Sequence, residues 1–105
     1  MYCTTPDMFV GEQEKRRFEG VKNSVRLTRY GGDCYAYGLL AAGHVDVVLD
    51  CDLKPYDIQA LIPIIEAAGG VVTDWQGNSA VDGGFVVASG STAIHEQTLR
   101  ILQMP

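Results

Sequence analysis

Residues 54–70 read KPYDIQALIPIIEAAGG, and this stretch decides the fold. It places one carboxylate, Asp57, at the start of a segment that is almost entirely apolar and that ends at Gly69 and Gly70. Asp is a preferred helix N-cap residue and Gly commonly follows the last turn, so we predict a helix over residues 57–68. Asp57 is then either a cap alone or a group that holds something a substrate needs, and the pattern leaves both roles open.

The predicted helix is apolar on nearly all sides. With successive side chains about 100° apart, Gln59 and Glu66 fall on one narrow stripe, and Pro63 lies near it. Such a helix is buried on most sides, and Pro63 should kink it because proline forfeits a backbone hydrogen bond. We expect it to pack against a second domain or another subunit, or between the chain's own sheet and another of its helices.

Outward from this helix, the remaining segments alternate between strand and helix patterns. Apolar and β-branched runs predict five strands, over residues 2–5, 24–30, 45–50, 71–75 and 85–89. Further helices are predicted over residues 10–22 and 92–103, and residues 31–44 predict a glycine turn followed by a helix that ends at Gly43. This order indicates a layered α/β/α domain over residues 1–105, with flanking helices on a mixed, largely parallel five-stranded sheet. A turn at residues 76–78 allows an antiparallel pair.

Composition excludes several classes of partner. The chain has 105 residues, a formal net charge of −5 and 47% hydrophobic residues, which is the makeup of one soluble globular domain. Nucleic acid and anionic membrane surfaces attract clustered Lys and Arg, so we expect neither as a partner. The basic cluster at residues 15–17 stands among glutamates and is interpreted as a solvated helix face. No apolar run is long enough to span a membrane.

The three cysteines form no CxxC motif, and their odd number favours a reducing compartment over a disulfide framework. Together with the absence of a signal-peptide pattern at the start, this predicts a cytoplasmic protein. The two histidines, His44 and His95, have no metal-ligand spacing. No Ser or Cys nucleophile motif such as GxSxG is visible.

Four carboxylates lie close together in the sequence: Asp46, Asp50, Asp52 and Asp57. Ligands of open α/β sheets bind at the carboxyl ends of strands, so Asp50 and Asp57 can face one crevice from opposite sides of a short loop. A rigid, ionised oxygen ligand there suits Mg²⁺. The alternative is two unrelated roles, with Asp57 a cap and Asp50 a solvated charge at a strand end.

The segment RYGGDCYAY (29–37) is a second candidate. Gly31 and Gly32 permit a tight turn into the next helix, whose free N–H groups can receive an anion. Asp33 argues against a phosphate there, because its own carboxylate would occupy or repel the anion; a polar or cationic part of a substrate fits better. The alternative is an ordinary glycine turn with Asp33 as the cap. Tyr35 and Tyr37 are interpreted as packing residues.

Together, GGDCYAYGLLAAGHVDVV (31–48) and LKPYDIQALIPIIEAAGGVVTDWQG (53–77) resemble the C-terminal half of the inositol monophosphatase family. The family pattern (W/Y)-D-x-x-A-x-x-x-I-x-x-x-A-G-G is filled at the same spacing by Tyr56-Asp57, Ala60, Ile64 and Ala68-Gly69-Gly70. TTPDMF (4–9), RYGGDCYAY and LKPYD look like its histidinol-phosphatase branch.

The resemblance implies roles for particular residues. Asp57 would be a catalytic residue that binds Mg²⁺ and lies near the substrate. The turn Gly32-Asp33-Cys34 would contact substrate, and Asp50 would contact the leaving-group portion, although the branch usually has Glu there. Histidinol phosphate carries an ammonium and an imidazole, which Asp33 and Asp50 suit by charge.

The activity implied is Mg²⁺-dependent hydrolysis of a small phosphate monoester, with histidinol phosphate favoured and inositol phosphate or another phosphomonoester as alternatives. The family's other metal carboxylates lie in an N-terminal half that has no counterpart in this chain. We therefore expect the chain to be inactive alone and to pack against that half or another subunit, a homodimer included. The different-class alternative is a non-catalytic half-domain that pairs with another chain.

Overall fold

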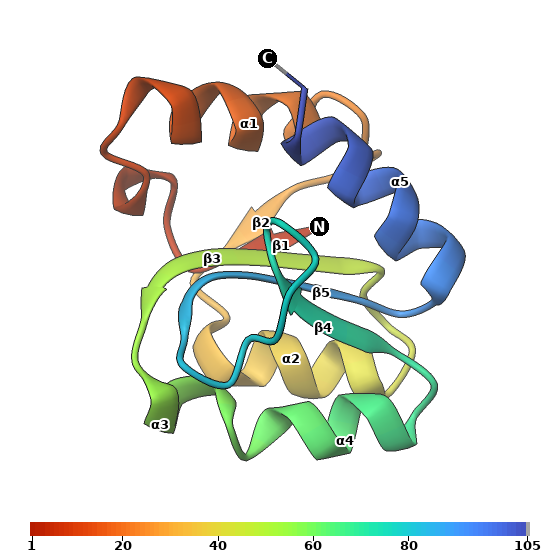
Figure 1. The fold of residues 1–105 in the computed structure, drawn as a ribbon. Helices are drawn as coiled ribbons and strands as arrows, with labels where there is room; N and C mark the ends of the chain where they lie inside the picture. The colour runs from red at the N-terminus through yellow and green to blue at the C-terminus, as the bar shows by residue number, and fades with distance from the viewer. Residues whose placement is uncertain (105) are drawn as a thin grey trace.

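A five-stranded sheet with the strand order β2-β1-β3-β5-β4 forms the centre of the computed structural model, which describes residues 1–104 (Figure 1). The strands are β1 (Tyr2–Cys3), β2 (Arg29–Tyr30), β3 (Val47–Leu53), β4 (Val71–Asp74) and β5 (Gly84–Ser89). The helices are η1 (Pro6–Met8), α1 (Glu12–Lys22), α2 (Asp33–Ala41), α3 (Pro55–Ile58), α4 (Leu61–Ala67) and α5 (Thr92–Leu102). Figure 1 shows α1 and α5 on one face of the sheet and α2 and α4 on the other, which confirms the layered α/β/α architecture.

The central strand β3 buries apolar side chains on both faces of the sheet. Val47, Leu49 and Cys51 join the core on the side of α1 and α5, where the Phe9 and Phe18 rings stack and Trp75 packs at a tilt against Phe9. Val48 points the other way and joins the core beneath α2 and α4. This alternation follows from the two-residue period of a strand.

The sheet is mixed, as expected, but it is not largely parallel. β1 pairs in parallel with β2 and with β3, yet β1 and β2 each contain only two residues. The longer ladders, β3 with β5 and β4 with β5, are antiparallel. β4 continues into β5 through a loop over residues 75–83, without the crossover helix that a parallel pair needs. The antiparallel pair expected around residues 76–78 is therefore present.

The strand predicted over residues 24–30 was wrong in most of its length. Only Arg29 and Tyr30 pair in the sheet, and Leu27 is 58% exposed. The alternation of Val25 and Leu27 with polar residues is real, but β2 is an edge strand and its partner β1 is only two residues long. A pattern of half-burial does not form a strand where the neighbour offers no further backbone to pair.

The helix predicted over residues 57–68 is broken into two. α3 begins at Pro55, and α4 begins at Leu61 after a turn at residues 59–60. Pro63 lies in the first turn of α4, where its missing N–H removes no helical hydrogen bond. We expected Pro63 to kink one continuous helix. Instead, the helix is broken on the N-terminal side of Pro63.

The end of α4 explains the paired glycines. Gly69 has φ +88°, its N–H donates to the Glu66 carbonyl (3.0 Å), and the Gly70 N–H donates to the Ile65 carbonyl (2.9 Å). This is a Schellman motif, which favours glycine at the left-handed position. Gly70 is required for a different reason: a Cβ there would lie 2.7 Å from the Ser89 carbonyl oxygen.

α4 buries only one side. Ile58 and Ile65 are fully buried against the sheet, whereas Ile64 is 54% exposed and Tyr56, on α3, is 80% exposed. The alternative that α4 packs between the chain's own sheet and another of its helices is partly confirmed, because α4 contacts both β4 and α2. The helix is nevertheless not buried on most sides, because Ile64 remains exposed. The outward apolar face is left uncovered within residues 1–104.

None of the helices described in residues 1–104 is long and apolar enough to cross a membrane.

Candidate functional site

Asp57 lies in the first turn of α3 and is exposed to solvent. The helix begins two residues earlier than predicted, so Asp57 is its third residue and not its N-cap. Its Oδ2 accepts a hydrogen bond from the Lys54 N–H at 2.8 Å, which satisfies a backbone donor at the helix start. Its Oδ1 makes no hydrogen bond to residues 1–104. The capping role is present, and one carboxylate oxygen remains available to a ligand.

Asp50 lies in the middle of β3 and is only 1% exposed. Its Oδ1 accepts from the Thr4 N–H at 2.8 Å, and its Oδ2 accepts from the Tyr37 hydroxyl at 2.7 Å. Burial raises the pKa of Asp50, and the two hydrogen bonds oppose that rise. The alternative of a solvated charge at a strand end is therefore wrong, and this geometry gives no support to direct contact between Asp50 and a substrate.

Tyr37 packs in the hydrophobic core, as predicted, and its hydroxyl also donates to Asp50, a role that we did not predict; Tyr35, also predicted to pack, is instead 70% exposed. Tyr37 is buried, and burial followed by the negative charge of Asp50 raises its pKa well above the ordinary value, so the hydroxyl stays protonated and donates. The signal in the sequence was its spacing: Tyr37 is four residues after Asp33, and side chains four apart lie on the same helix face.

The turn before α2 has the backbone strain that the glycine pair suggests. Gly31 has φ +85°, and Asp33, a non-glycine residue, has φ +46°. Gly32 is the N-cap of α2, and a Cβ there would lie 3.0 Å from the Tyr2 ring. Asp33 is the first helical residue and is exposed like Cys34, so it is not the cap that the alternative interpretation required. A left-handed Asp costs roughly 1–2 kcal/mol, and such strain is concentrated at functional sites.

The structure brings Asp33 together with Asp50 and Asp57, two of the four carboxylates that lie close in the sequence. The charge of Asp33 contributes to the raised pKa of Asp50, and the charge of Asp57 contributes to the raised pKa of Tyr37. Asp46 is not part of this group, because it immediately precedes β3 and lies beside the cavity at the N-terminal end of that strand.

A complete metal site is not present in the described part of the chain. Residues 1–104 contain no group of three or more His, Cys, Asp or Glu side chains that could hold a metal ion. Mg²⁺ takes six oxygen ligands, of which usually one or two are protein carboxylates. Asp57 fits as one such ligand, but these residues do not fit the whole centre.

The other candidate groups have structural roles. Burial raises the pKa of the Cys3 and Cys51 thiols to about 12, so both remain neutral core residues. His95 Nε2 lies 2.8 Å from Thr73 Oγ1, which donates to the Asp74 carbonyl and must therefore accept from Nε2–H. Nδ1, 2.9 Å from Ser89 Oγ, is left as an acceptor. This buried network joins α5 to the sheet.

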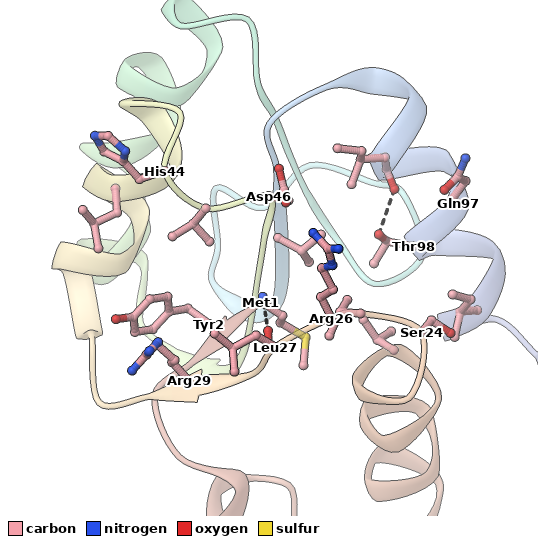
Figure 2. Close-up of a pocket in the computed structure, with 17 residues that line it drawn as sticks. Met1, Tyr2, Ser24, Arg26, Leu27, Arg29, His44, Asp46, Gln97 and Thr98 are labelled. Carbon is pink, nitrogen blue, oxygen red and sulfur yellow. Dashed lines mark hydrogen bonds between the residues drawn. The ribbon is translucent and has the colours of Figure 1, made fainter.

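A cavity of about 690 Å³ lies at the end of the sheet where β3 begins. Figure 2 shows the Met1 amino group inside it, donating to the Leu27 carbonyl at 2.8 Å, with Arg26, His44 and Asp46 around it. Of the candidate carboxylates, Asp46 lines this cavity, whereas Asp33, Asp50 and Asp57 do not, so the cavity is separate from their neighbourhood.

The fold is that of a class of solved phosphatases. The chain superposes on an inositol monophosphatase from Zymomonas mobilis with a TM-score of 0.91 and 37% identity, over 98% of this chain and 41% of that chain. The model of the inositol monophosphatase family matches residues 4–104. This chain belongs to the inositol monophosphatase family, as the resemblance indicated.

Its relatives include histidinol-phosphatases. It is 47% identical to the chloroplastic bifunctional phosphatase IMPL2 of Arabidopsis thaliana, over 98% of this chain and 32% of that protein. It is 32% identical to the histidinol-phosphatase of Mycobacterium tuberculosis, over 81% of this chain and 32% of that protein. The chain thus spans about a third of the length of these relatives.

Proposed function

We propose that this chain is the C-terminal part of a Mg²⁺-dependent phosphate monoesterase, with histidinol phosphate as its favoured substrate. The observation that carries the proposal is Asp57, an exposed carboxylate with one oxygen fixed by the Lys54 N–H and the other available. It belongs to the same group of side chains as the strained turn at residues 31–34. Membership of the family supports this reading.

Each exposed residue takes one proposed role. Asp57 is a metal ligand, and the turn Gly32-Asp33-Cys34 contacts the substrate. The Asp33 carboxylate suits the cationic part of histidinol phosphate by charge. Bound Mg²⁺ would activate a water and neutralise charge on the phosphoryl oxygens. Residues 1–104 offer only part of a metal site, and the proposal is that further ligands come from another part of the protein.

The uncovered face of α2 and α4 is the proposed contact with that part. Apart from Asp33 and Glu66, neither helix carries a charged residue. Tyr35 on α2 is 70% exposed, and Ile64 on α4 is also largely exposed. The remainder of a longer phosphatase is favoured over a second copy, because the relatives are about three times as long. Whatever covers this face also lies beside Asp33 and Asp57 and can supply the missing ligands.

A chimera tests the function. Residues 1–105 replace the matching segment of the Arabidopsis relative, and phosphate release from histidinol phosphate is measured with Mg²⁺. We expect turnover by the chimera, none by the chain alone, and loss of turnover in the chimera with Asp57→Asn. The unmodified relative and an Asp82→Asn chimera, in which an exposed loop carboxylate is changed, are the controls. A folded but inactive chimera contradicts the proposal.

The same assay decides between substrates. Inositol phosphate is the second candidate, favoured by the fold match to the Zymomonas inositol monophosphatase. The exposed Asp33 beside the substrate turn favours the cationic alcohol instead, so histidinol phosphate should be hydrolysed faster. Equal failure on both esters, with normal pairing to the rest of the relative, would favour a non-catalytic half-domain. The cytoplasmic location stays a prediction, and the Arabidopsis relative is described as chloroplastic.

A further inference from the structure

We propose that Asp50 is a positioning residue that clamps the Gly31–Cys34 turn from both ends. The clamp gives a mechanical role to a buried carboxylate that does not reach solvent. Its importance for substrate binding rests on the proposed function of the turn, but the clamp itself is a property of this chain.

The first arm runs through the backbone after β1. The Thr4 N–H donates to Asp50 Oδ1 at 2.8 Å, and the Thr4 carbonyl accepts from the Gly31 N–H at 2.9 Å. The same Gly31 N–H also lies 3.2 Å from the Cys3 carbonyl. Two consecutive hydrogen bonds thus connect the carboxylate to the residue that opens the turn.

The second arm runs through the first turns of α2. The Tyr37 hydroxyl donates to Asp50 Oδ2 at 2.7 Å. Tyr37 is four residues after Asp33 and lies on the same face of α2, so this bond holds the helix start that carries Asp33. One carboxylate therefore holds the backbone before the turn with one oxygen and the helix after it with the other.

The clamp accounts for the strained backbone between its arms. A left-handed Asp33 persists only where the surrounding structure holds it in place. Hydrogen bonds to a buried carboxylate are stronger than those at the surface, because the local dielectric is low. Asp50 and Tyr37 are both nearly inaccessible to water, so the bond between them lies in such a low-dielectric region.

Hydrogen exchange of the chain tests the clamp independently of catalysis. Tyr37→Phe and Asp50→Asn should speed exchange of the Gly31 and Ala36 amides, which donate to the Thr4 and Gly32 carbonyls, by about 10- to 100-fold, the effect of losing a hydrogen bond to a charged group. Exchange in β5, over residues 86–89, reports global stability and should rise much less. Thr73→Val, which removes a partly buried hydrogen bond to His95, is the matched control and should leave the ratio of exchange at the turn to exchange in β5 unchanged.

The outcomes separate the clamp from the proposed function. Exchange at the turn that rises only in step with β5, or that is unprotected already in the unaltered chain, overturns the clamp. If Asp50→Asn unfolds the chain, Tyr37→Phe still decides, since it removes one hydroxyl and keeps the ring. In an active chimera, Tyr37→Phe should raise KM about tenfold or more with kcat changed less than about twofold. An inactive chimera contradicts the function and leaves the exchange result standing.

Discussion

Two substitutions of Asp57 separate helix capping from metal binding. Asp57→Asn keeps an oxygen that can accept from the Lys54 N–H, whereas Asp57→Ala removes the 2.8 Å bond. Loss of a capping side chain costs about 0.5–2 kcal/mol, and this solvent-exposed site belongs at the lower end. We therefore expect Asp57→Ala to lower the free energy of unfolding by about 0.5–1 kcal/mol and Asp57→Asn to change it by less than about 0.5 kcal/mol.

The loss of activity should depend on the loss of the Asp57 charge and not on the loss of the cap. An amide is a poor ligand for Mg²⁺, and metal stabilisation of the transition state is worth several kcal/mol, so both variants of the chimera should lose about a thousandfold in activity.

Urea unfolding of the chain measures the capping term. With a slope of roughly 1–3 kcal/mol per molar, Asp57→Ala should move the midpoint down by about 0.2–1 M. Phosphate release by the chimera measures the metal term, with Asp82→Asn as the control for both assays. Near-normal turnover by Asp57→Asn would refute the assignment of Asp57 as a metal ligand. An Asn variant as unstable as the Ala variant would refute the capping argument.

Three further predictions concern stability and assembly. Gly70→Ala should destabilise the chain by about 1–3 kcal/mol, because its Cβ would meet a backbone carbonyl. Gly69→Ala should destabilise it by about 1–2 kcal/mol, because residue 69 has a positive φ. Urea unfolding midpoints check both, and an unchanged midpoint for Gly70→Ala would contradict the account of this helix end. Burial lowers the pKa of His95 below its ordinary 6.5, so the unfolded chain takes up the proton more readily. Stability present above pH 6.5 should be lost as pH falls from there through the folded pKa, and His95→Gln should flatten this part of a urea midpoint-versus-pH curve; an unchanged slope would exclude His95 as its source. Ile64→Lys should change the stability of the chain by less than about 0.5 kcal/mol but abolish activity of the chimera, because a lysine would be buried at the proposed contact; an active chimera would show that this face stays open.

Most helices and strands could be predicted from local patterns in the sequence. Both helices of one layer end at glycines in positive φ, Gly43 and Gly69, as the sequence patterns predicted. The apolar, β-branched segment that forms β3 was recognisable because a strand buried on both faces lacks alternation. Pro63 correctly marked an irregularity, although the helix breaks instead of kinking.

The failures share a physical origin, because each depends on a neighbour distant in the sequence. Leu27 is exposed since the adjacent strand is too short to extend the pairing. Asp50 could be placed near Asp57 by spacing, but its burial depends on Thr4 and Tyr37, which are 46 and 13 residues away in the chain. Periodicity reports which face of an element is apolar and carries no information on which polar groups meet across elements.

An insertion or deletion at the irregular end of β3 would affect the loop that follows and the core that precedes it differently. The β3–β5 register shifts between Asp50 and Leu53, and Asp52 adopts φ +54° in that interval. Such bulges absorb a residue without disturbing the ladder on either side and redirect the chain that follows. Insertions or deletions at this point would move Asp57 relative to Asp50 while the buried pairs from Val47 to Asp50 keep their register. The position of Asp57 relative to the buried Asp50 can therefore change without any change in the core that supports them.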